Sequence, residues 1–217
     1  DAAHLAALLE ATKGERITHI LVTHTHRDHS PGVAALKAAT GAPSYGFGPH
    51  MTPPEQGGEG GDHDFRPDVV LADGATVAGA DWRVTALHTP GHCANHLCFA
   101  LENAHTSRTL FSADHVMSWS TSVVSPPDGD MAAYMASLGK LQARDDDLYL
   151  PGHGPPLPNP QPFVAALAKH RREREARVLE ELRRAGRASA EALVPAVYGA
   201  ALDPRLIPAA ARSLTAH

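Results

Sequence analysis

Apolar residues in the first two-thirds of the chain follow two kinds of pattern. Short runs of apolar and β-branched residues are typical of strands, whereas apolar residues three or four positions apart are typical of helices. The runs predict strands at 17–23, 82–88, 96–101, 109–113 and 148–150. Helices are predicted at 3–13, 33–40 and 131–141. Because strands alternate with helices, the pattern predicts an α/β fold.

Local signals mark several boundaries in this part of the chain. Gly14 is suited to end the first helix. Ser30 and Pro31 are suited to begin the second, as an N-cap and a first helical residue. Residues 41–66 are rich in glycine and proline, and the run 56–61 predicts a mobile loop.

The composition changes after a proline-rich segment at 155–162, which we interpret as a linker. Arginine and glutamate then separate the apolar positions of a long helix that Gly186 ends. The apolar stripe of this helix consists of Phe163, Leu167, His170, Val178, Leu179 and Leu182. Two further helices are expected from Ser189 and from Asp203-Pro204. The sequence therefore predicts an α/β domain at 1–160 and a small all-helical appendage at 161–217.

Composition and charge exclude some classes of function. The formal net charge of −5 provides no broad basic surface for nucleic acid. No apolar run is long enough to span a membrane, and the first residues show no signal-peptide pattern. Cys93 and Cys98 lack the spacing of a redox or disulfide motif, so a cytoplasmic location is the default expectation. Nothing in the sequence indicates an oligomeric state.

The most distinctive stretch is Thr-His-Thr-His-Arg-Asp-His-Ser at 23–30, which lies between a predicted strand and a predicted helix. Four potential metal ligands are crowded into this one turn. Neutral imidazole and carboxylate groups are good ligands for zinc and similar divalent cations. His24 and His26 can converge on one ion, and Asp28 and His29 suit a second.

Three further motifs carry ligands, and each follows a predicted strand. They are Thr-Pro-Gly-His at 89–92, Phe-Ser-Ala-Asp-His at 111–115 and Pro-Gly-His-Gly at 151–154. Sites in open α/β sheets gather beyond the carboxyl ends of strands. His92, Asp114 and His153 can therefore meet the four ligands of the first turn at one sheet edge.

Taken together and in this order, the four motifs resemble those of the metallo-β-lactamase superfamily. The resemblance implies an αββα sandwich that binds two zinc ions, with manganese or iron as alternatives. His24, His26 and His92 resemble the ligands of the first metal. Asp28, His29 and His153 resemble those of the second, and Asp114 resembles the carboxylate that bridges both. Domains of this family normally open with a β-hairpin before the helix at 3–13, and none is present here. A winged-helix tail would also continue past His217, so the sequence is expected to be truncated at both ends.

The tail has a narrower resemblance. His-Arg-Arg-Glu-Arg-Glu at 170–175, Leu-Val at 193–194 and Val-Tyr at 197–198 resemble the winged-helix tail of the "lactamase, beta 2" branch. One member of that branch is a zinc-dependent endoribonuclease acting on single-stranded RNA. The resemblance implies that Arg171, Arg172 and Arg174 contact an RNA backbone. The alternation of arginine and glutamate also fits an ordinary salt-bridged helix surface.

The expected chemistry is metal-dependent hydrolysis. Two cations about 3.5–4 Å apart can share a water and deprotonate it near neutral pH, and the bridging hydroxide then attacks a carbonyl carbon or a phosphorus. Asp28 can also orient this nucleophile, and Asp114 holds both metals. The leading prediction is an endoribonuclease of single-stranded RNA. The alternatives are a thioesterase resembling hydroxyacylglutathione hydrolase, a lactonase for small esters, and a non-catalytic nucleic-acid-binding protein on a lactamase-like body.

Other residues near the motifs are expected to lie outside the ligand set. His96 either faces the substrate or stabilises its own turn. His115 is expected to lie behind the metal ligands. Cys93 adjoins His92, and we expect it to pack rather than to bind metal, because the imidazole set is complete without it.

Overall fold

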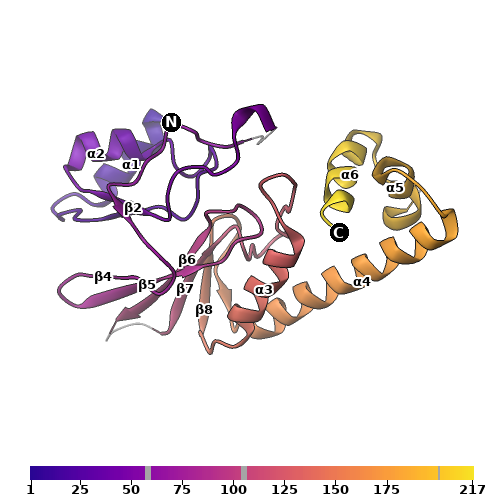
Figure 1. Ribbon diagram of the computed structural model, residues 1–217. Coiled ribbons are helices and arrows are strands. Elements are labelled where there is room, and N and C mark those ends of the chain that lie inside the picture. Colours follow the sequence, from indigo (N-terminus) through magenta and orange to yellow (C-terminus); the bar gives the residue numbers. More distant parts are fainter. Residues whose placement is uncertain (57–59, 104–106, 200) are drawn as a thin grey trace.

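The computed structural model describes residues 1–56, 60–103, 107–199 and 201–217. Residues 57–59 of the expected mobile loop at 56–61 lie outside the described residues. Two β-sheets pack face to face, with helices on their outer sides (Figure 1). This is the αββα arrangement of layers that the resemblance to the metallo-β-lactamase superfamily implies.

The first sheet is small and parallel. It contains β1 (Ile20–Leu21), β2 (Ser44–Gly46) and β3 (Val69–Val70), in that order. Helix α2 (Val33–Thr40) packs on its outer face, where Val33 joins Ile20 in a buried apolar cluster. Helix α1 (Ala2–Ala11) lies on the same side of the molecule and buries no residue (Figure 1).

The second sheet has six strands in the order in which they occur in the sequence. They are β4 (Thr76–Ala78), β5 (Trp82–His88), β6 (Leu97–Asn103), β7 (Thr109–Ala113), β8 (Leu148–Pro151) and β9 (Leu157–Pro158). Only β7 and β8 pair in parallel, because α3 (Met131–Gln142) connects them as a crossover helix.

Strand β6 shows how the two sides of this sheet are filled. Successive side chains of a strand point to opposite faces. Leu97 and Phe99 accordingly contact the core between the sheets, whereas Cys98 and Ala100 contact the core beneath the helices. This strand is buried on both faces, which explains its nearly continuous apolar sequence.

The C-terminal helices use two separate apolar clusters. The first half of α4 (Gln161–Ala185) buries Val164 and Leu167 in the same core as α3. The second half, with α5 (Ala190–Tyr198) and α6 (Ile207–Thr215), surrounds a smaller cluster that includes Val194 and Leu214. Residues 161–199 and 201–217 contain helices without strands, so the β-wing of a winged helix is absent from this described part of the tail.

Some sequence predictions are wrong in detail. Ser30 does not cap α2, whose N-cap is Gly32; the Ser30 hydroxyl instead donates to Asp62 Oδ2 at 2.6 Å. Strand β1 spans two residues rather than seven. The apolar stripe expected along α4 is not buried throughout, because Leu179 is 45% and Leu182 38% exposed.

Among the described residues, no helix combines the length and the apolar character needed to cross a membrane.

The core beneath α3 and α4 provides a test of this packing. Leu138 of α3 is fully buried there. We expect Leu138→Ala to lower the free energy of unfolding by about 2–5 kcal/mol, since it removes buried methyl groups and leaves a cavity. Leu179→Ala is the matched control on an exposed helix position, and it should change stability by less than about 0.5 kcal/mol. Equal losses in denaturant-unfolding experiments would contradict the assigned core.

Candidate metal centre

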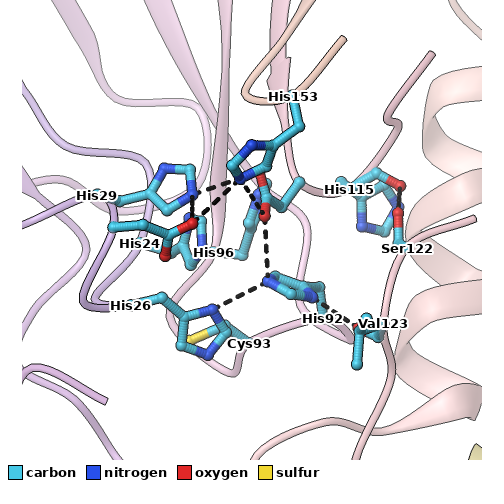
Figure 2. A network of polar contacts seen from close by, with 12 residues as sticks. His24, His26, His29, His92, Cys93, His96, His115, Ser122, Val123 and His153 are labelled. Atoms are coloured by element: carbon cyan, nitrogen blue, oxygen red, sulfur yellow. Dashed lines mark hydrogen bonds and ion pairs between the residues drawn. The ribbon is translucent and has the colours of Figure 1, made fainter. Parts of the chain in front are cut away.

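The turn after β1 and the carboxyl ends of β5, β7 and β8 bring seven potential ligands together. Figure 2 labels the five histidines among them. The turn after β1 provides four of the seven ligands. His92 lies four residues beyond β5, Asp114 directly follows β7, and His153 lies two residues beyond β8. The sheet order therefore assembles groups that are up to 129 positions apart in the sequence.

Three histidines form the first group. His92 Nε2 lies 3.0 Å from His26 Nδ1. The ring centroid of His24 is 4.7 Å from that of His26 and 5.1 Å from that of His92. One ligand atom from each residue lies within 4.8 Å of the others, which is the spacing needed to surround one cation.

Asp28, His29 and His153 form a second group with the same limit of 4.8 Å between ligand atoms. Asp28 Oδ2 lies 3.1 Å from His153 Nε2 and 3.5 Å from His29 Nε2. This group is more open to solvent than the first, since the Asp28 side chain is 60% exposed.

Asp114 lies close to histidines of both groups. Its Oδ1 is 3.4 Å from His29 Nε2, on the side of the second group. Its Oδ2 is 3.7 Å from His92 Nε2 and 3.5 Å from His153 Nε2. A carboxylate has two oxygens and can bridge two cations from this position.

Hydrogen bonds behind the ligands fix two of the rings. His92 Nδ1 donates to the backbone carbonyl of Val123 at 2.6 Å, which leaves Nε2 facing the centre. His24 Nδ1 makes a hydrogen bond with Thr23 Oγ1 at 3.1 Å. Such outer contacts determine the tautomer and the orientation of metal-binding histidines.

The protonation states suit cation binding. Burial and the neighbouring His96 lower the pKa of His24 well below its usual value. Burial and His92 lower the pKa of His26 to about 4. Burial raises the pKa of Asp114, but the nearby imidazoles of His29, His92 and His153, His29 above all, bring it below its usual value. Neutral imidazoles and an ionised carboxylate are the forms that bind metals.

Unpaired polar atoms provide an independent test of whether this site fits metal ions. His24 Nε2, His29 Nε2 and Asp114 Oδ1 are buried without a hydrogen-bond partner among the described residues. Burying polar atoms in this way is costly, and such atoms are rare in folded proteins. Divalent cations would satisfy all three, and the nitrogen and oxygen donor set suits zinc, manganese or iron.

Two glycines of the sequence motifs lie so close to neighbouring atoms that a side chain would not fit there. A Cβ on Gly152 would lie 2.4 Å from Asp114 Oδ1 and 3.1 Å from His29 Cε1. Gly91 has a φ of 135°, and a Cβ there would lie 2.3 Å from Tyr134 Cα. The glycine before His92 and the glycine before His153 therefore allow these ligands to approach the rest of the site.

The structure separates the other predicted site residues from the seven ligands. His96 is fully buried behind His24, with ring centroids 5.0 Å apart, and its Nδ1 makes a hydrogen bond with Thr89 Oγ1 at 2.9 Å. This burial favours a structural role over contact with a substrate. Arg171 is buried, Arg174 is partly buried and Arg172 is exposed on α4. The three arginines therefore do not form one continuous exposed surface.

Sequence patterns gave no indication of Asp128. Its ligating atoms and those of His26 and Cys93 lie within 4.8 Å of one another. Burial raises the pKa of the Cys93 thiol, which keeps the sulfur protonated and makes it a poor metal ligand. Asp128 Oδ1 accepts a hydrogen bond from Thr52 Oγ1 at 2.8 Å, so this carboxylate joins two loops beside the metal centre.

Comparison with known families identifies the class of protein. The model of the metallo-beta-lactamase superfamily matches residues 2–153, and the chain belongs to this superfamily. Atrochrysone carboxyl ACP thioesterase AgnL7 of Paecilomyces divaricatus is 34% identical over 213 residues, which cover 93% of this chain and 61% of that protein. The atrochrysone carboxyl ACP thioesterase of Aspergillus fumigatus is 31% identical and covers 90% of this chain and 60% of that protein.

Solved structures support the same fold. The metallo-beta-lactamase family protein TTHA1429 from Thermus thermophilus superposes with a TM-score of 0.73 over 99% of this chain and 77% of that chain, at 22% identity. The protein TTHA1623, solved in a di-iron-bound form, is 28% identical with a TM-score of 0.59, over 75% of this chain and 82% of that chain.

The prediction of an RNA-cleaving enzyme is wrong. The curated relatives described above are named as thioesterases, and a third, thioesterase pkgB of Emericella nidulans, is 32% identical over 75% of this chain and 42% of that protein. The tail motifs that suggested the endoribonuclease branch are short, and the charge pattern of α4 is common to solvated helices. The chain spans about two-fifths to three-fifths of the length of these three relatives.

The close approach at Gly152 leads to a prediction about metal content. We expect Gly152→Ala to lower metal affinity at least about tenfold, because the added methyl group would displace Asp114 or His29. Gly139→Ala in α3 is the control, since a Cβ there meets nothing within 4 Å. Metal titration of both variants, with unfolding measured in parallel, separates loss of the site from loss of the fold. Unchanged affinity in Gly152→Ala would contradict the close packing.

Proposed function

We propose that this chain is the catalytic part of a metal-dependent hydrolase that cleaves thioesters. The observation that carries the proposal is the similarity to acyl-carrier-protein thioesterases across 93% of the chain, at 34% identity. That similarity extends beyond the part matched by the superfamily model, which ends at residue 153. The similarity therefore includes residues of the C-terminal helices as well as of the part matched by the superfamily model.

The proposed metal site uses all seven ligands. His24, His26 and His92 would hold one divalent cation. Asp28, His29 and His153 would hold a second, and Asp114 would be shared between them. When bound, two such cations supply an acidified water and polarise the carbonyl group of the substrate. The di-iron form of a protein 28% identical to this chain supports iron as an alternative to zinc.

The residues around the site suit hydrolysis of an acyl group. A cavity of about 440 Å³ is lined by His26, Arg27, Asp28, Gly60, His92 and Asp114. Asp28 faces this opening with its exposed carboxylate, where Oδ2 can orient the attacking water and accept its proton. Attack on the thioester carbon breaks the carbon–sulfur bond. The products are a carboxylic acid and a thiol, and the proton taken from water balances the released thiolate.

The thiol half of the substrate distinguishes the two kinds of thioesterase. A hydroxyacylglutathione hydrolase releases glutathione, whereas the relatives described above are named for thioesters of an acyl carrier protein. The carrier-protein thiol is therefore the better proposal. A non-catalytic binding protein is disfavoured, because the ligand set has no missing member.

The proposal predicts which substrates are cleaved and that cleavage depends on metal. Metal-loaded protein should hydrolyse an acyl thioester of 4′-phosphopantetheine or of a carrier protein faster than a lactone of similar size. Chelation should abolish thiol release, measured with a thiol-reactive dye, and added Zn²⁺, Mn²⁺ or Fe²⁺ should restore it. Activity that survives complete metal removal, confirmed by elemental analysis, would rule out this function.

Asp114 provides a second test. We expect Asp114→Asn to reduce hydrolysis at least about a thousandfold and to lower the number of metal ions bound per chain, since it removes the negative charge shared by both groups. Asp81→Asn is the control, because it removes an exposed carboxylate from the turn before β5. A variant at Asp114 that keeps wild-type turnover and two bound metals would contradict the shared role.

A further inference from the structure

A second cavity, of about 280 Å³, lies between the loop at 120–125 and the C-terminal helices. The loop forms one wall, and α4, α5 and α6 form the other. Its polar lining includes Ser120, Thr121, Arg171, Arg174, Arg212 and Ser213. No carboxylate of the described residues lines this cavity, so its lining carries three guanidinium groups and no acidic side chain.

Two of these arginines are held in place by aromatic rings. The Arg174 guanidinium lies 3.9 Å from the ring centroid of Tyr198, and that of Arg171 lies 5.3 Å from the ring centroid of Tyr134. Cation–π contacts of this kind restrict the position of the guanidinium group, whose N–H groups can still donate hydrogen bonds. The arginines are therefore preorganised by the fold.

Unpaired donors remain within this arrangement. Arg171 is only 5% exposed; one of its terminal nitrogens donates to the carbonyl of Ser122, but Nε has no partner among the described residues. Nη1 of Arg174 is also buried without one. A buried cationic donor without an acceptor is costly, and an oxyanion in the cavity would satisfy it. Burial, Arg174 and Arg171 together lower the pKa of His170, another lining residue, in keeping with a positive potential here.

The cavity adjoins the metal centre. Val123 lines the cavity, and its carbonyl accepts the hydrogen bond that orients His92. The Val123 side chain is 62% exposed, so the loop that separates the two sites presents an apolar surface rather than a charged barrier. A single substrate that lay across this loop would contact both sites.

We infer that this cavity binds the phosphate group of the thiol-bearing arm of the substrate. The inference rests on the proposed thioesterase function, since a carrier-protein thioester is attached through 4′-phosphopantetheine. Arginine edges recognise phosphate through paired, charge-assisted hydrogen bonds. The hydroxyl groups of Ser120, Thr121 and Ser213 provide further donors. The arm would be held by its phosphate while its thioester lies at the metal centre.

The test compares two substrates that differ only in this phosphate. An acyl thioester of 4′-phosphopantetheine and the same thioester of pantetheine are assayed with metal-loaded wild-type protein, Arg174→Gln and Arg172→Gln. The wild type should prefer the phosphorylated substrate at least about tenfold in kcat/KM. Arg174→Gln should lose most of this preference through KM, with little change on the pantetheine thioester. Arg172→Gln is the matched control, because it removes an exposed charge two positions away on the same helix.

Direct binding separates failure of this inference from failure of the proposed function. Binding is measured by calorimetry with 4′-phosphopantetheine and with pantetheine, since neither compound is a thioester that could be hydrolysed. Wild-type protein should bind the phosphorylated compound more tightly, and Arg174→Gln should lose this difference in affinity. If neither thioester is cleaved but this binding preference holds, the proposed function fails and the phosphate site stands. Equal binding of both compounds by the wild type, or equal losses in Arg172→Gln and Arg174→Gln, would overturn the phosphate site. So would competition by glutathione but not by phosphopantetheine, which would identify a carboxylate as the ligand.

Discussion

The site depends on a cluster of buried polar groups, several of which have no hydrogen-bond partner among the described residues. Five imidazoles and two carboxylates converge at one edge of the sandwich, and Nε2 of His24, Nε2 of His29 and Oδ1 of Asp114 have no hydrogen-bond partner among the described residues. Burial alone would disfavour this arrangement. Cations in the two groups would offset this cost, and the groups come together because four separate segments end at the same place. The close contacts at Gly152 and Gly91 show how little space the ligands leave for other atoms.

Residues with local signals could be predicted from the sequence. Strands β5 and β7 begin and end where alternation and apolar runs place them, and α5 begins directly after its N-cap Ser189. Strands β2 and β9 were missed because each has only two or three residues, within segments rich in glycine and proline, and is defined by its pairing with neighbouring strands. Ser30 was expected to be an N-cap, but the distant carboxylate of Asp62 competed successfully for its hydroxyl.

The same distinction applies to the site. Four candidate ligands share one turn and the other three follow strands, so a topological rule sufficed to bring them together. Asp128 approaches His26 through a loop, and no spacing in the sequence indicates this contact. Arg171 was expected on an RNA-binding or salt-bridged helix surface, yet it is buried beneath the loop at 120–125. Contacts of this kind depend on how the C-terminal helices pack, which periodicity alone does not determine.

Helix α4 connects this packing to the metal centre through a short series of contacts. Arg171 of this helix donates a hydrogen bond to the backbone carbonyl of Ser122. The hydroxyl of Ser122 donates to the carbonyl of His115 at 2.8 Å. The carbonyl of Val123, the residue after Ser122, accepts the hydrogen bond that orients His92. The loop at 120–125 is therefore fixed on one side by α4, the helix proposed to bind phosphate. On the other side it is fixed by the segment that follows β7 and carries Asp114. Two of these bonds are accepted by backbone carbonyls of the loop, those of Ser122 and Val123, so they constrain the course of the loop backbone. A helix that is anchored in the core by Val164 and Leu167 thus positions both an arginine of the second cavity and the loop that orients a metal ligand.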